Sequence, residues 1–133
     1  MKRKADHIRE AMACLLSAED RLRSVAQLHS GSMTIFLLAI QLGALRALLF
    51  PISFWYGGVT DRHLILLPID RTSGKPQFDQ AGMFPLNAVR TAGDRIIVNL
   101  PNTLKPVNLR VMNLSKTLSG LDAAEFMAAV RGR

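Results

Sequence analysis

The sequence predicts an α+β fold in which a curved antiparallel sheet is capped by one C-terminal helix. Several short runs of apolar or alternating residues, separated by turn residues, fill the second half of the chain. Two adjacent glycines, Gly57 and Gly58, interrupt one of these runs and are typical of a bulge or of a close approach by another backbone. The chain ends in an amphipathic helical pattern. Its 133 residues suit a single domain with a small appendage.

An amphipathic helix is expected near the N-terminus, over residues 5–16. Apolar residues recur there at the helical spacing i, i+3, i+4, i+7 and i+8: Ile8, Ala11, Met12, Leu15 and Leu16. We assign residues 1–20 to the N-terminal segment that contains this helix and residues 21–133 to the main domain. Cys14 is assigned to the apolar face, so its thiol is expected to be buried and inert. It is the one cysteine of the chain, which excludes an intramolecular disulfide and indicates a reducing, cytoplasmic location.

A strongly apolar segment, residues 33–50, follows a predicted strand at residues 22–29. It is apolar on every side of a helical wheel and stops before Pro51, which cannot continue a helix. Eighteen helical residues span roughly 27 Å, the lower limit for a membrane crossing. A crossing would separate the strands on either side of it, and Arg46 opposes insertion. We expect an inserted apolar helix buried in the protein, with a dimer contact or a membrane surface as alternatives for its exposed remainder.

Residues 54–60 and 64–69 predict a β-hairpin around the turn residues Thr60 to His63. Both alternating sets of the second strand are apolar, so this strand is expected to be covered on both faces. The core of the sheet supplies one cover. The helix predicted over residues 33–50 is the candidate for the other.

Three further segments complete the predicted sheet, and a capped helix ends the chain. The strands are expected at residues 84–89, 95–100 and 107–112. In the last strand the predicted inward residues are Val107, Leu109 and Val111, and the outward residues are Asn108 and Arg110. In the final helix we expect Asp122 to cap the N-terminus, with Glu125 three residues later. Leu121 and Phe126 occupy the two positions of a hydrophobic staple.

The hairpin residues also carry a family resemblance. The stretch VTDRHLILL, residues 59–67, resembles the hairpin of bacterial pleckstrin-homology-like (PH-like) domains, which are relatives of GRAM domains. FPLNAV, residues 84–89, is similar to the strand that follows in that family, and the order of elements agrees over residues 22–130. The resemblance implies a PH-like, partly open antiparallel β-barrel of seven strands capped by the C-terminal helix. It also implies a role in binding lipid headgroups or protein partners, usually without catalysis.

The sequence departs from the family pattern in three respects. The apolar helix predicted over residues 33–50 is not part of that pattern, and the C-terminal helix lacks the tryptophan that is common in eukaryotic members. There is also no clear basic phosphoinositide motif in an early hairpin. The last departure weighs against lipid recognition.

The chain carries a net charge of +7, from 17 Lys and Arg against 10 Asp and Glu. Such an excess favours partners that bear phosphates, and it also serves solubility. In a ligand-binding interpretation, Arg62 in the hairpin turn acts with Arg71 and Lys75 from the next connection. In the structural alternative, Asp61 bonds its own backbone in the turn and Arg62 points to water.

The aromatic trio Phe54-Trp55-Tyr56 also admits two interpretations. It can form the interior of a strand, or it can present a ring to a base or to a membrane interface. For a protein-interaction surface, the candidates come from the predicted inserted helix and from the aromatic trio that follows it. They are Leu42, Leu45, Arg46 and Trp55.

The sequence contains no recognisable catalytic or metal-binding pattern. His7, His29 and His63 are far apart, and none belongs to a metal-ligand pair or a nucleophile motif. We therefore predict a non-catalytic binding or localisation module without a cofactor. Protein–protein interaction or self-association into a homo-oligomer is the first expectation for its partner. Peripheral binding to an anionic membrane surface is the alternative, while a nucleic acid partner and a small enzyme are less favoured.

Overall fold

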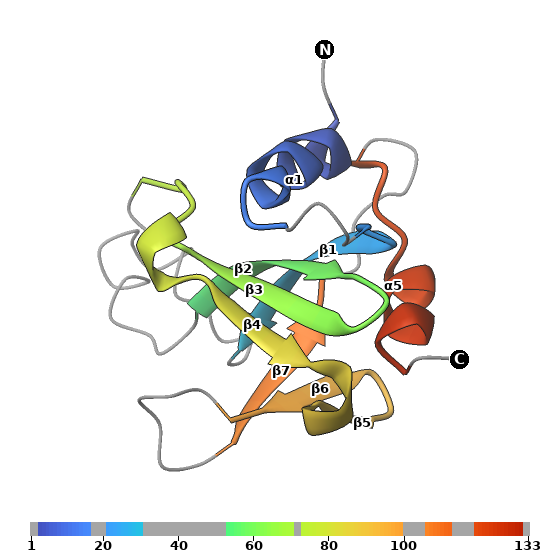
Figure 1. The fold of residues 1–133 in the computed structure, drawn as a ribbon. Helices are drawn as coiled ribbons and strands as arrows, with labels where there is room; N and C mark the ends of the chain where they lie inside the picture. Colours follow the sequence, from blue (N-terminus) through green and yellow to red (C-terminus); the bar gives the residue numbers. More distant parts are fainter. Residues whose placement is uncertain are drawn as a thin grey trace, which may run out of the picture.

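The computed structural model describes residues 3–16, 21–30, 53–70, 73–99, 106–112 and 119–131 (Figure 1). Within these ranges a run of seven strands lies between two helices in the sequence. In chain order the elements are α1 (Lys4–Ala13), β1 (Ser24–Ser30), β2 (Ser53–Val59), β3 (His63–Ile69), the 3-10 turn η1 (Phe78–Gln80), β4 (Gly82–Pro85), the 3-10 turn η2 (Leu86–Ala88), β5 (Arg90–Ala92), β6 (Arg95–Val98), β7 (Val107–Val111) and α5 (Ala123–Val130). Every strand predicted from the sequence therefore has a counterpart in the structure.

The strands form one antiparallel sheet in the order β4-β3-β2-β1-β7-β6-β5. Neighbours in sequence pair from β1 to β4 and from β5 to β7, and β1 joins the two groups by pairing with β7. Although β4 and β5 are consecutive in sequence, they lie at opposite ends of the sheet. In Figure 1, strands β5–β7 turn across β1–β4. The structure confirms the PH-like α+β fold, a partly open barrel of seven strands capped by the C-terminal helix.

The inner face of the sheet and one side of α5 form the larger core cluster. Phe126, Met127 and Val130 of α5 pack there with residues from β1, β2, β3, β6 and β7. Helix α5 begins as predicted, because the Oδ1 of Asp122 accepts a hydrogen bond of 3.1 Å from the backbone N–H of Glu125. The two residues of the predicted hydrophobic staple are both buried but belong to different clusters: Phe126 to this one and Leu121 to the cluster under α1.

Helix α1 covers the outer face of the sheet. Ala5, Ile8 and Met12 are its buried residues. They form a second cluster with Val25, Tyr56, Ile65, Leu67 and Leu121. Strand β3 is therefore apolar on both faces as predicted, and its outer residues Ile65 and Leu67 belong to the same cluster as α1. The sequence also predicted a cover from the helix over residues 33–50. That predicted helix lies outside the described residues. No helix of the described ranges combines the length and the apolar character that a bilayer crossing needs.

The glycine pair in β2 makes room for side chains and does not form a bulge. Residues on both sides of Gly57 and Gly58 pair in unbroken register with β1 and β3. A Cβ on Gly57 would lie 2.8 Å from Cδ1 of Leu28 and 3.0 Å from Cζ of Phe126. A Cβ on Gly58 would lie 2.8 Å from Cδ1 of Leu22 and 3.3 Å from Sδ of Met12. The sequence predicted a bulge or a close approach of another backbone at this pair, whereas the atoms that come close belong to side chains from the two covered faces.

Cys14 and the predicted strand at residues 84–89 are placed differently from expectation. Helix α1 ends at Ala13, and Cys14 at its C-cap is exposed, with its Sγ donating to the carbonyl oxygen of Ala11 at 3.1 Å. Because an α-helix rotates by about 100° per residue, Cys14 points roughly 200° away from the buried Met12 around the helix axis. The other segment leaves the sheet at Pro85 and continues as η2, because proline has no N–H for the ladder.

We expect Gly57→Ala to lower the free energy of unfolding by about 1–3 kcal/mol, because both side chains that the new methyl group meets are fully buried. Gly58→Ala is the matched control. It is expected to lower the free energy of unfolding less, because the side chains that its methyl group meets can move: Leu22 is half-buried and Met12 is flexible. Urea denaturation of the two variants measures the difference. A Gly57→Ala protein as stable as the wild type would show that the contact with Phe126 relaxes easily.

Candidate functional site

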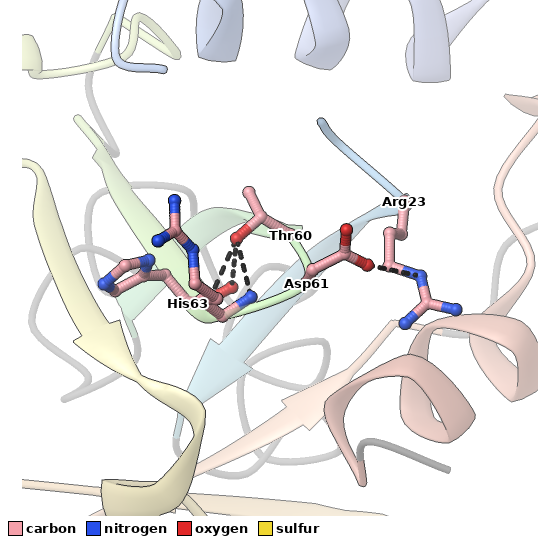
Figure 2. A network of polar contacts seen from close by, with 5 residues as sticks. Arg23, Thr60, Asp61 and His63 are labelled. Carbon is pink, nitrogen blue, oxygen red and sulfur yellow. Dashed lines mark hydrogen bonds and ion pairs between the residues drawn. The ribbon is translucent and has the colours of Figure 1, made fainter. Parts of the chain in front are cut away.

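The turn between β2 and β3, the first candidate region, is organised by Thr60. Its hydroxyl is buried and accepts hydrogen bonds from the backbone N–H groups of Arg62 (3.3 Å) and His63 (3.0 Å). The backbone N–H of Thr60 donates to the carbonyl oxygen of His63 at 2.9 Å, which closes the turn. Figure 2 shows these contacts converging on the Thr60 oxygen. The hydroxyl of Thr60 thus stabilises the conformation of this turn.

Asp61 does not bond its own backbone as the structural alternative predicted. Its Oδ1 instead forms an ion pair of 3.4 Å with Nε of Arg23, which precedes β1. The side chains of both residues are mostly exposed, so the pair contributes little to stability. It nevertheless occupies the carboxylate of the turn and directs it toward β1 and away from His63 (Figure 2).

Of the three cations predicted to hold a ligand, the structure describes Arg62 and Lys75. Arg62 is exposed at the start of β3, and Lys75 is exposed in the connection beyond the end of β3. A strand of seven residues is about 20 Å long, so these two positions lie beyond opposite ends of β3. Arg71 lies outside the described residues. The described geometry therefore supports no shared anion pocket for Arg62 and Lys75.

Of the predicted interaction residues, the structure describes only Trp55, which is buried. Its side chain is 8% exposed and belongs to the larger core cluster. Neighbouring Tyr56 faces the opposite way into the cluster under α1, where the Nζ of Lys4 lies 5.2 Å from the ring centre. Trp55 and Tyr56 are thus strand interior, while Phe54 is half-buried. Trp55 is a core residue and not part of an exposed surface. Leu42, Leu45 and Arg46 lie outside the described residues.

The histidines do not assemble a reactive centre in the described part of the chain. His7 lies on α1, His29 near the end of β1 and His63 at the start of β3. No group of three metal-ligating side chains occurs among the described residues. A catalytic pair of His63 and Asp61 would need both groups in one pocket, whereas the Asp61 side chain is 71% exposed and turned away from the imidazole (Figure 2).

One margin of the sheet exposes apolar side chains beside a free strand edge. Phe78 in η1 is 45% exposed and Met83 in β4 is 44% exposed. Strand β4 pairs only with β3, so its other edge is open as far as the described strands are concerned. Between Pro76 and Val89 the only charged residue is Asp79. We call this region, with Phe78, Met83 and the open edge of β4, the β4 margin.

The outer face of β5–β7 carries three exposed arginines that sequence reasoning did not select. Arg95 on β6 and Arg110 on β7 are direct cross-strand partners. Arg90 on β5 is diagonal to Arg95, since its own partner on β6 is Ile97. None of the three forms an ion pair with another described residue. We call Arg90, Arg95 and Arg110 the arginine face.

A signal for the arginine face was present in the sequence. Between Asp94 and Asp122 the chain has no acidic residue, while it has four basic ones: Arg95, Lys105, Arg110 and Lys116. The outward placement of Arg110 was also predicted correctly from the alternation in β7. Charge segregation of this kind indicates a positive surface once the register of the strands is known.

We expect Thr60→Val to lower the free energy of unfolding by about 1–3 kcal/mol, because it leaves the N–H groups of Arg62 and His63 without their acceptor. Thr60→Ser keeps the hydroxyl and is expected to lose less. Urea denaturation measures both variants. If Thr60→Val proves as stable as the wild type, water must replace the hydroxyl in this turn.

Comparisons with known proteins add one structural likeness. No family model matches the sequence, and no curated protein matches it. Among solved structures, the chain is similar to the crystal structure of a DUF1696 family protein with a pleckstrin-homology domain from Shewanella loihica PV-4. The two chains are 14% identical, and the alignment covers 95% of this chain and 89% of that chain with a TM-score of 0.41. The PH-like fold described above therefore rests on the order and pairing of the strands.

Proposed function

We propose that this protein is a non-catalytic binding module that acts through protein contacts and associates first with a second copy of itself. The observation that carries the proposal is the β4 margin, where Phe78 and Met83 remain nearly half exposed beside an open strand edge. Fully burying an exposed side chain of this size contributes about 1.5–3 kcal/mol, so burying the remaining exposed part of Phe78 or Met83 contributes about 1 kcal/mol each. An open strand edge adds backbone hydrogen-bonding groups to the same surface.

Charge favours a second copy as the occupant of the β4 margin. A chain with a net charge of +7 repels itself over most of its surface. The stretch from Pro76 to Val89 carries a single charge, on Asp79, so two copies can meet there with little repulsion. Homodimers commonly use one patch twice around a two-fold axis, and a neutral apolar patch suits this arrangement.

The length of the edge limits how the two copies can meet. Strand β4 has four residues and ends at Pro85, which lacks a backbone donor. Backbone pairing alone is therefore too short to hold a dimer, and the side chains of Phe78 and Met83 must supply most of the contact area. The same brevity protects the edge from open-ended strand pairing.

The other functions considered from the sequence have less support. Peripheral membrane binding through Arg62, Arg71 and Lys75 requires one common surface, whereas Arg62 and Lys75 lie beyond opposite ends of β3. An enzymatic function requires a nucleophile, a base or a metal set held in one place. The His63 and Asp61 side chains, which would be the nearest such pair, point in different directions (Figure 2).

We expect the purified wild-type protein to form a dimer and Met83→Glu to convert it to a monomer. A glutamate at this position would place two carboxylates and their water shells inside a contact that is otherwise apolar. Light scattering distinguishes the monomer mass of 14.7 kDa from twice that value across a series of concentrations.

Two further variants make this experiment specific. Ala124→Glu adds the same charge at an exposed position of α5 and is expected to leave the dimer intact. Leu45→Glu tests the surface predicted on the helix over residues 33–50. A wild type that is monomeric at every concentration contradicts self-association, while dispersal by Leu45→Glu and not by Met83→Glu would move the contact away from the β4 margin.

A further inference from the structure

The arginine face holds two like charges directly opposite each other. Arg95 and Arg110 face one another across β6 and β7, where Cβ atoms lie about 4.5–5.5 Å apart. Like charges in this position destabilise a sheet. Their row continues to Ala92 on β5 and to His29 on β1, neither of which is acidic. The nearest acid in sequence, Asp94 in the β5–β6 turn, forms no ion pair with a described residue.

We infer that the arginine face binds an acidic, extended segment of a partner polypeptide. This interaction goes beyond self-association and uses none of the residues of the β4 margin. A carboxylate placed between Arg95 and Arg110 would accept hydrogen bonds from both guanidinium groups and remove their repulsion. Arginine suits this task because its planar fork binds carboxylates in a bidentate manner.

The spacing of the three arginines matches an extended chain. Arg90 and Arg95 are diagonal neighbours, which places them about 7–8 Å apart. In an extended polypeptide, side chains two residues apart point the same way and are separated by about 6.6–7 Å. Alternate acidic residues of one segment can therefore reach Arg90 and the Arg95–Arg110 pair at the same time.

Two features favour a polypeptide over the other polyanions. Among the described strands β5 is the last in the sheet. Its two-residue turn to β6 makes Ala92 and Arg95 a hydrogen-bonded pair, so that the N–H and C=O of Thr91 point away from β6. A donor and an acceptor side by side match the backbone of an extended peptide. Residues 90–112 contain no aromatic side chain, whereas sheet surfaces that hold single-stranded nucleic acids stack the bases on aromatic rings.

The test measures binding of a fluorescein-labelled decaglutamate peptide by fluorescence anisotropy. We expect the wild type to bind it and the double variant R95Q/R110Q to bind about tenfold more weakly, since each exposed charge pair contributes up to about fivefold. The control R9Q/R21Q removes two exposed arginines elsewhere and changes the net charge equally. It is expected to weaken binding by about threefold or less. Far-UV circular dichroism confirms that both variants are folded.

Several results would overturn the inference. Absence of binding by the wild type would contradict the inference directly. Equal losses in the two double variants would mean that only the overall charge matters. Tighter binding of single-stranded DNA or of phosphatidylserine vesicles, lost in R95Q/R110Q, would assign the face to a nucleic acid or a membrane. Light scattering of R95Q/R110Q separates this inference from the proposed function, because the variant is expected to keep the mass of the wild type. A change of mass would place the arginine face in the self-association contact.

Discussion

The two covering helices pack on β2 from opposite sides at neighbouring residues. The described fold depends on the absence of side chains at these two positions of β2. Gly57 lies under Phe126 of α5, and Gly58 lies under Met12 of α1. Successive residues of a strand point to opposite faces, so a single glycine would relieve only one of the two contacts. The pair is therefore needed because both faces of the sheet are covered at this point. The strand register is unbroken around the pair, so the glycines allow the helices to pack closely on β2 and do not bend the strand.

This double cover decides where a partner can bind. The packing of α1 is mainly on β1 and β2, and α5 fills the inner face, so the middle of the sheet offers little free surface. The β4 margin and the outer face of β5–β7 lie away from the α1 cover, at the two ends of the strand order. One is almost uncharged, and the other is positive and forms no ion pair with another described residue. A module with two such surfaces can contact a copy of itself and an acidic segment without competition between them.

The sequence predicted elements well and the partners of those elements poorly. Periodicity located α1, α5 and the strands, and the cap at Asp122 followed from three neighbouring residues. The apolar pattern of β3 indicated that both faces are covered but did not indicate that Ile65 and Leu67 share a cluster with α1. Asp61 was paired with its own turn because its actual partner, Arg23, is distant in sequence. Relations across the sheet depend on register, and local patterns do not contain it.

Register also explains why the arginine face persists despite its repulsion. On the inner side of the same two strands, Ile96 faces Leu109 and Val98 faces Val107, and Ile96, Val98 and Leu109 are buried in the core. A slip of one residue would separate Arg95 from Arg110 but would also turn this apolar set toward water. The core thus holds the backbone positions of Arg95 and Arg110 opposite each other before any ligand arrives. A carboxylate that binds between them meets a site whose strands are already ordered, which reduces the entropy lost on binding.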